Sequence, residues 1–177
     1  IGLQSPDDRE LKILGRIHNY EQFLETYRSA REAGFDNINI DLMSAIPDQT
    51  YEGWIHNLRT VAGLDPEHIS AYSLIIEEGT PFASRTLNLP DEDAEYNMYE
   101  ATAQILREYG FEQYGISNYG KKGRECRHNV GYWIRQDYLG FRLGDKNNYE
   151  KKRFANTQDM KKYLENSSKK VISILFL

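Results

Sequence analysis

The residues best suited to chemistry lie close together in one stretch, Y-G-I-S-N-Y-G-K-K-G-R-E-C-R-H-N-V-G-Y-W, residues 114–133. It contains the single cysteine, Cys126, and one of the four histidines, His128. Both side chains can bind a metal ion, although a packed thiol and a hydrogen-bonded imidazole are the commoner roles. Residues two apart do not share a helical face, so both would reach one ligand only from an extended or turning segment. A structural zinc site is disfavoured because one cysteine would need three partners from elsewhere.

A second set of polar residues lies where predicted strands end. Gln4 follows the apolar start of the chain, Asp41 is near the end of a predicted strand over 36–43, and Tyr72 to Glu78 end another over 68–76. Any one of them alone would be interpreted as a loop cap. Because the carboxyl ends of successive parallel strands meet at one edge of a sheet, these residues are expected to face one cleft.

The elements that must position these residues alternate between strand and helix. Strands are expected at 1–4, 36–43, 68–76 and 111–117, and helices are expected to begin at Ser5, Asn19, Thr50 and Asp91. This order is typical of βαβ units and predicts a parallel sheet. In the strand over 36–43, Ile38, Ile40 and Leu42 share one face. Asn37, Asn39 and Asp41 share the other, which is unusual for a strand covered on both sides.

Composition limits the class of protein. The 177 residues are enough for one core and part of a second domain, and the net charge of -5 argues against general nucleic-acid binding. A single cysteine excludes an internal disulfide and fits a reducing, cytoplasmic compartment. No transmembrane segment is expected, and the apolar residues 171–177 are too few to span a bilayer but leave peripheral membrane contact open. The first residue is Ile1 instead of methionine, so we expect a fragment.

Three runs of the sequence resemble one family: I-N-I-D-L-M-S, P-E-H-I-S-A-Y-S-L-I-I-E-E-G-T-P-F and C-R-H-N-V-G-Y-W. The family is the oxygen-independent coproporphyrinogen III oxidase-like branch of the radical SAM proteins, specifically the HemW-type heme chaperones. The resemblance covers residues 1–141 and resumes weakly at 153–164. Its most specific parts are I-I-E-E-G-T-P and C-x-H-N-x-x-Y-W, and the second distinguishes the chaperone-like branch from true coproporphyrinogen oxidases.

The resemblance implies two sets of ligand-binding residues. Gln4, Arg16 and Asp41 match positions that contact S-adenosylmethionine in relatives, and Ile75 lies near a position that lines the same pocket. A carboxylate can bind ribose hydroxyls or an ammonium group, and an arginine can pair with a carboxylate. For heme, the resemblance implies an imidazole ligand to the iron and aromatic rings over the porphyrin. The residues of this second set are His128, Asn129, Tyr132 and Trp133, with Cys126 as an alternative ligand.

Two departures from the family stand out. The C-x-x-x-C-x-x-C motif that holds a [4Fe-4S] cluster is absent, so the cluster is expected only in a full-length protein and this chain alone should be inactive as a radical SAM enzyme. After Gly140 the family has a Gly-rich loop, whereas this chain has Arg142 and Asp145-Lys146-Asn147.

We therefore expect an α/β fold: residues 1–112 form the later half of a partial parallel (β/α) TIM-like radical SAM barrel, and residues 113–177 start a small C-terminal accessory domain. The expected function is that of a fragment of a heme chaperone that binds S-adenosylmethionine and delivers heme to recipient hemoproteins. One alternative is a radical SAM coproporphyrinogen III dehydrogenase, which carries out oxidative decarboxylation in porphyrin biosynthesis. Another is an inactive truncated remnant. An exposed edge at Ile1 to Gln4 would allow a homodimer.

Overall fold

The computed structural model describes residues 1–165 and 173–174 and divides into two compact units, Ile1–Glu125 and Cys126–Leu177. The boundary between them follows Glu125, whereas the sequence placed the start of an accessory domain at residue 113. Most of the apolar tail at 171–177 lies outside the described residues.

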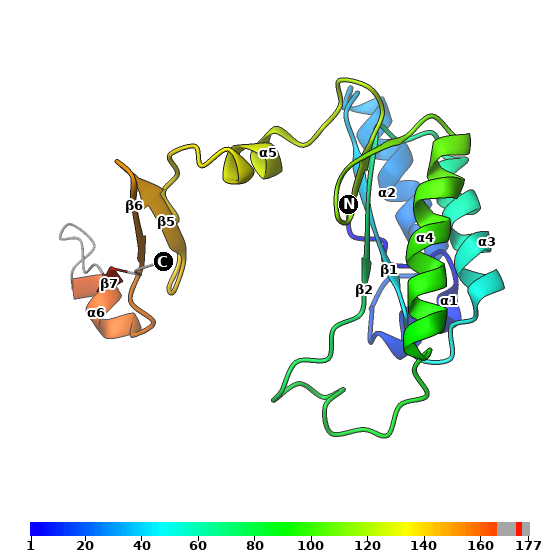
Figure 1. Cartoon of the computed structure of the whole chain (residues 1–177), viewed down its shortest axis with the longest axis horizontal. Coiled ribbons are helices and arrows are strands. Elements are labelled where there is room, and N and C mark those ends of the chain that lie inside the picture. Colours follow the sequence, from blue (N-terminus) through cyan, green and yellow to red (C-terminus); the bar gives the residue numbers. More distant parts are fainter. Residues whose placement is uncertain (166–172, 175–177) are drawn as a thin grey trace. The chain divides into compact units, whose positions relative to one another are not determined.

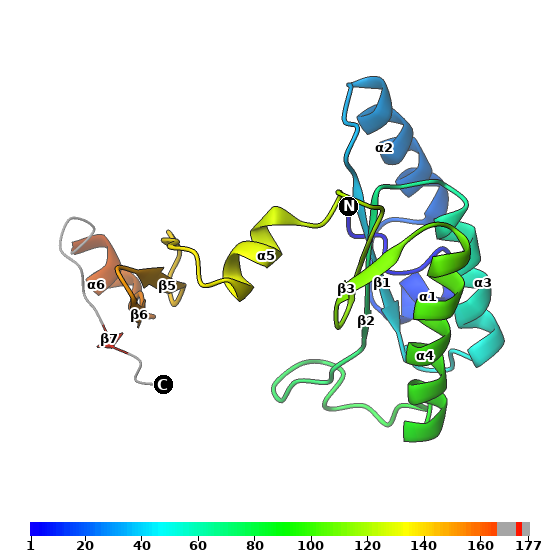
Figure 2. The same ribbon diagram turned by 45° about the horizontal axis from the view of Figure 1, so that its top comes forward.

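The first unit is a four-stranded sheet with four helices (Figures 1 and 2). The strands follow the order β1-β2-β4-β3 across the sheet. In chain order, the elements are α1 (Asp8–Ile13), α2 (Tyr20–Glu32), β1 (Asn39–Ser44), α3 (Tyr51–Ala62), β2 (His68–Ser73), α4 (Glu92–Glu108), β3 (Glu112–Gly115) and β4 (Asn118–Gly120).

The predicted parallel arrangement is present at the start of the sheet. β1 and β2 pair in parallel, with Asp41 opposite Ser70. Gln4 forms a parallel bridge with Leu42. The backbone N–H of Gln4 donates to the Asp41 carbonyl at 2.7 Å, and the backbone carbonyl of Gln4 accepts from the Met43 N–H at 2.8 Å. The first residues of the chain therefore lie along β1 as a further parallel segment, as expected for consecutive βαβ units.

The prediction of one parallel strand over 111–117 is wrong. This segment contributes β3, which turns back through Ile116 and Ser117 into β4, and β4 runs antiparallel to β2. Because two residues allow only a hairpin, β4 could not be a parallel neighbour of β3. β3 itself runs in the same direction as β2, so α4 makes the expected crossover, and β4 lies between β2 and β3.

Helix starts follow local capping chemistry, with one exception. Asn19 and Gln22 form a reciprocal capping box, and Thr50 and Asp91 cap α3 and α4, as predicted. Ser5 does not cap α1, because Asp7 accepts from the Arg9 amide instead. The Ser5 hydroxyl donates to the buried Glu10 carboxylate at 2.5 Å, so this residue joins the interior of the fold.

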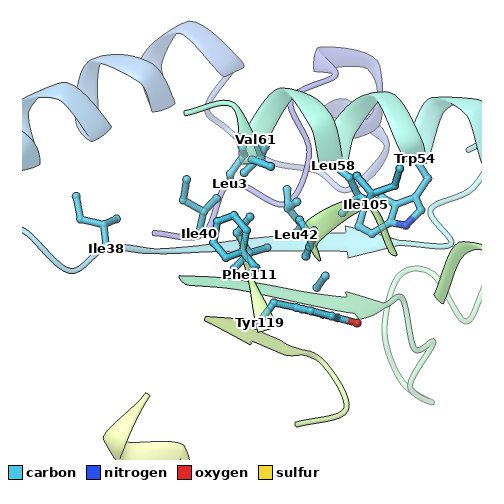
Figure 3. Close-up of a cluster of buried hydrophobic side chains, with 14 of the residues drawn as sticks. Leu3, Ile38, Ile40, Leu42, Trp54, Leu58, Val61, Ile105, Phe111 and Tyr119 are labelled. Atoms are coloured by element: carbon cyan, nitrogen blue, oxygen red, sulfur yellow. The ribbon is translucent and has the colours of Figure 1, made fainter. Parts of the chain in front are cut away.

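Helices cover one face of the sheet (Figures 1 and 2). Burial alternates along β1, with Ile40 and Leu42 fully buried and their neighbours only half-buried. Figure 3 shows these side chains beneath Leu58 and Val61 of α3. Trp54 joins α3 to α4: its indole N–H lies 2.9 Å from the Thr102 hydroxyl and 3.2 Å from the Met98 carbonyl. This packing against one face leaves the polar residues of β1 on the other.

The opposite face of the sheet carries a directed chain of hydrogen bonds. The Asp41 carboxylate can only accept, so the Asn39 amide donates to it at 2.6 Å and presents its oxygen to His68 Nδ1, also at 2.6 Å. His68 Nδ1 is therefore the donor. In the neutral ring Nε2 accepts from the Tyr114 hydroxyl at 2.5 Å. Burial lowers the pKa of His68, although the Asp41 and Glu125 carboxylates oppose this, and a lowered pKa favours the neutral ring.

The second unit comprises α5 (Arg127–Trp133), β5 (Lys146–Tyr149), β6 (Lys152–Ala155), α6 (Met160–Glu165) and β7 (Ser173–Ile174), with strand order β5-β6-β7. Side-chain amides stabilise the loop before β5. Asn147, 1% exposed, accepts from the Gly140 amide at 2.8 Å, and Asn156 donates to the Gly140 carbonyl at 2.9 Å. A side chain at Gly140 would collide with Asp145, which explains glycine there. Across the described parts of both units, no helix combines the length and apolar character needed to cross a membrane.

The α3–α4 contact should dominate the stability of the first unit. Trp54, 1% exposed, fills this contact and makes two hydrogen bonds, so Trp54→Ala should lower the free energy of unfolding by about 3–5 kcal/mol. Tyr51→Ala is the matched control on the same helix, because Tyr51 is 42% exposed, and should cost within about 0.5 kcal/mol. Urea unfolding followed by circular dichroism measures both, and equal losses would contradict this role of Trp54.

The lowered pKa of His68 predicts a pH dependence of stability. The unfolded chain binds a proton to this histidine near pH ~6.5, whereas the folded chain binds it only at lower pH. Between these values the unfolded state holds more protons, so this contribution to stability is complete above pH ~6.5 and falls as the pH drops below it. Urea midpoints at about pH 7.5 and 5.5 should therefore differ less in His68→Gln than in the parent. His56→Gln, at an exposed histidine, should match the parent; an unchanged difference in His68→Gln would refute the prediction.

Candidate functional site

Three of the residues predicted for S-adenosylmethionine converge on Gly2. A methyl group at Gly2 would lie 3.1 Å from Gln4 Nε2, 3.3 Å from Arg16 Nη2 and 3.9 Å from Asp41 Oδ2. An amide, a guanidinium and a carboxylate thus surround one backbone position that has no side chain. The expected convergence of strand ends also extends to β2, because the Tyr72 hydroxyl donates to Gln4 Oε1 at 2.9 Å.

Different local features hold these side chains. Gln4 is 5% exposed and has a φ of 73°, a left-handed conformation that glutamine rarely adopts. Asn39 binds one oxygen of Asp41, and the other oxygen faces Gly2. Arg16 follows α1, where its amide donates to the Leu11 carbonyl at 2.9 Å. Its guanidinium reaches back to the Gly2 carbonyl at 3.5 Å.

The electrostatics of this cluster keep Tyr72 as a hydrogen-bond donor. Burial raises the pKa of Tyr72, and the Asp41 carboxylate raises it further. The hydrogen bond to Gln4 and the charge of Arg16 act in the opposite direction without reversing the shift. Tyr72 is therefore neutral at physiological pH and orients the Gln4 amide with its nitrogen toward Gly2.

This donor set fits S-adenosylmethionine. The carboxylate of Asp41 suits hydroxyl or ammonium donors, and the guanidinium of Arg16 suits a carboxylate. Both groups approach Gly2 together with Gln4, so closely that a methyl group at Gly2 would be crowded. Ile75 stands apart from this cluster, in the loop after β2 with its side chain 79% exposed. Sequence reasoning did not identify Gly2, His68 or Tyr114 as site residues. Asn39 was indicated only by its place on the polar face of its strand.

The histidine motif of the second unit forms a helix. Cys126 is the extended residue before α5, and its side chain makes no capping bond to the helix. His128 and Tyr132 are four residues apart on α5, so their rings meet edge to face with centroids 4.6 Å apart. Tyr132 makes a similar contact with Tyr138 at 4.5 Å. The remaining predicted residues, Asn129 and Trp133, are also on this helix, and Trp133 is 50% exposed.

A cavity of about 660 Å³ lies beside these rings, within the second unit. Tyr132, Trp133 and Tyr138 give it aromatic surface, and the volume falls within the range of about 300–1,000 Å³ typical of small-molecule sites. Large aromatic rings left exposed beside a cavity suit a flat apolar ligand such as heme. His128 is exposed on the same helix and can present a ring nitrogen to a metal.

The residues do not fit an iron–sulfur cluster. Such a cluster needs several cysteine thiolates, and Cys126 is the only cysteine of the sequence. Among the described residues, no three histidine, cysteine or acidic side chains are grouped as a metal site.

Comparisons with known proteins indicate which family the chain resembles. Residues 1–61 match the model of the Radical SAM superfamily. Heme chaperone HemW of Bacillus subtilis (strain 168) is 37% identical over 168 residues, which cover 93% of this chain and 44% of that protein. Heme chaperone HemW of Escherichia coli (strain K12) is 41% identical over 144 residues, which cover 81% of this chain and 38% of the relative.

The fold also matches a solved structure, coproporphyrinogen III oxidase (HemN) from Escherichia coli, described as a radical SAM enzyme. The TM-score is 0.79 at 20% identity, over 98% of this chain and 43% of the other. The chain thus spans less than half the length of the relatives it matches. The resemblance inferred from the motifs is confirmed: residues 1–61 match the radical SAM superfamily, and the chain is similar to the HemW heme chaperones over most of its own length.

Proposed function

We propose that this chain is part of a cytoplasmic heme chaperone that binds S-adenosylmethionine in its first unit and heme in its second, and passes heme to recipient hemoproteins. In this proposal, residues 1–112 are part of a radical SAM barrel and 113–177 begin the accessory domain. The observation that carries it is the series of ring contacts His128–Tyr132–Tyr138 beside a cavity. A histidine followed by aromatic rings in edge-to-face contact offers an iron ligand and an aromatic surface for the macrocycle.

The first unit supports the S-adenosylmethionine part of the proposal. Asp41 would receive hydrogen bonds from the ribose hydroxyls or the amino group, and Arg16 would pair with the carboxylate. Tyr72 would hold the Gln4 amide in place, and Ile75 would line the pocket. The bound molecule would supply a sulfonium whose reductive cleavage needs a cluster, and the cluster ligands are not in this sequence.

Coproporphyrinogen dehydrogenase activity has no separate observation in its favour. The structural match to the oxidase is at 20% identity and therefore supports the fold alone. Both functions use a tetrapyrrole. A chaperone must hold the iron-loaded form, and an exposed histidine beside aromatic rings suits that form. An inactive remnant would bind neither ligand, so binding measurements separate it from the proposal.

Binding of S-adenosylmethionine should depend on Asp41 and on the space at Gly2. Asp41→Asn removes a charged acceptor, which should weaken binding about 10- to 100-fold. Gly2→Ala should also weaken it, because the new methyl would occupy the position on which the three polar groups converge. Equilibrium dialysis with S-adenosylmethionine measures both. Asp36→Asn, whose parent side chain is 88% exposed, is the control; parent-like binding by Asp41→Asn would rule out this assignment.

Heme binding should depend on His128. Titration of the chain with hemin should give a saturable Soret band, and His128→Ala should abolish the ligand-dependent shift because the iron loses its imidazole. His56→Ala, at an exposed histidine of the first unit, is the matched control and should bind like the parent. Retention of the shift in His128→Ala, with loss in Cys126→Ser, would transfer the ligand role to the thiol. No saturable binding by the parent would exclude heme binding by this chain.

A further inference from the structure

The cavity of the second unit has a cationic side that the histidine motif does not account for. Besides the aromatic rings, it is lined by Arg135, Lys151 and Arg153. Asp137 also lines it and accepts from the Glu150 amide at 3.4 Å. Within the described parts of the chain, none of the three cations forms an ion pair. Three positive charges against one carboxylate make this side of the cavity attractive to an anion.

The fold fixes the cations relative to the aromatic rings. Tyr138 pairs with Asn148 of β5, and Asn148 pairs with Arg153 of β6, both antiparallel. Residues directly opposite each other in antiparallel strands project from the same face of the sheet. Tyr138, Asn148 and Arg153 therefore form one row, which places a phenol and a guanidinium at opposite ends of the same wall of the cavity.

The other two cations depend on unusual backbone conformations. Arg135 has a φ of 58° just after α5, and Lys151 has a φ of 61° in the two-residue turn between β5 and β6. Positive φ is rare for residues with long side chains and costs about 1 kcal/mol or more at each position. Glycine or asparagine would relieve this cost. The sequence instead retains a positive charge at both points, and both side chains line the cavity.

We propose that this side of the cavity binds the propionate carboxylates of heme, with Tyr132, Trp133 and Tyr138 against the macrocycle. The inference rests on the proposed heme-binding function and adds Arg135, Lys151 and Arg153 as positioning residues. Guanidinium groups pair with carboxylates through two parallel hydrogen bonds, and an ammonium group adds a point charge. An aromatic wall next to separate cations matches an apolar ring that bears two carboxylates on one edge.

The test compares hemin with hemin dimethyl ester, which has the same iron and ring but no propionate charge. The parent chain should bind hemin about fivefold or more tightly than the ester, and Arg153→Gln should remove most of this preference by weakening hemin alone. The double variant Arg135→Gln/Arg153→Gln should weaken hemin further. Added salt should reduce hemin affinity in the parent more than in the variants, because exposed charges are screened.

Two controls separate charge from structural damage. Lys152→Gln removes an exposed cation of the same hairpin that does not line the cavity, and should leave the preference unchanged. Arg153→Lys keeps the charge and should retain most of the preference for hemin over the ester. Equal affinity of the parent for both ligands, or equal weakening of both by Arg153→Gln, would overturn the inference while leaving histidine-dependent heme binding in place. Absence of saturable hemin binding by the parent would overturn the inference and the proposed function together.

Discussion

The first unit depends on the strict alternation of side chains along β1 and β2. Helices pack on one face of the pair, so every second residue must be apolar, as Ile40, Leu42 and Ile69 are. The residues between them face the other side, and the parallel register sets Asn39 opposite His68 and Asp41 opposite Ser70. A slip of one residue would bring carboxylate and amide groups under the helices and separate the polar network. Packing of the core and geometry of the candidate site are thus set by the same register.

The sequence predicted what local chemistry determines. The capping residues Asn19, Thr50 and Asp91 and the polar face of β1 were all recognised, because periodicity and caps act over a few residues. The β3–β4 hairpin was missed because its turn, Ile116-Ser117, contains no glycine, asparagine or proline that would indicate a reversal. Ser5 was assigned as a cap from its place before Pro6, but Asp7 caps α1 and the Ser5 hydroxyl donates to the buried Glu10, five residues along the chain.

In both candidate sites, residues of a local motif were predictable from the sequence, whereas contacts that depend on strand pairing were not. Gln4, Arg16 and Asp41 were named from a resemblance, and Asn39 and Tyr72 were indicated by the strand pattern, but the hydrogen bond from Tyr72 to Gln4 and the approach of Asp41 to Gly2 follow only from strand pairing. In the second unit the motif residues were named, whereas the cations were not. Arg153 reaches the cavity through its register with Asn148, and Lys151 through the turn that joins two strands. Neither relation is visible in residue spacing, since both depend on which strands pair.

Backbone strain links the two units to their proposed ligands. Among the residues that the structure describes, seven other than glycine have positive φ; three of these are aspartate or alanine in loops or turns, and one is Glu150. The remaining three, Gln4, Arg135 and Lys151, have long polar side chains, for which positive φ is rare; at Lys151 the two-residue turn with Glu150 requires it. Each of them contributes to a candidate site: Gln4 to the cluster around Gly2, and the two cations to the cavity. A strained conformation persists only where surrounding contacts enforce it, and for Gln4 and Lys151 those contacts are the Gln4–Leu42 bridge and the β5–β6 hairpin. The positive φ angles of Gln4, Arg135 and Lys151 thus coincide with the candidate sites, whereas Glu150, in the same turn as Lys151, does not line the cavity.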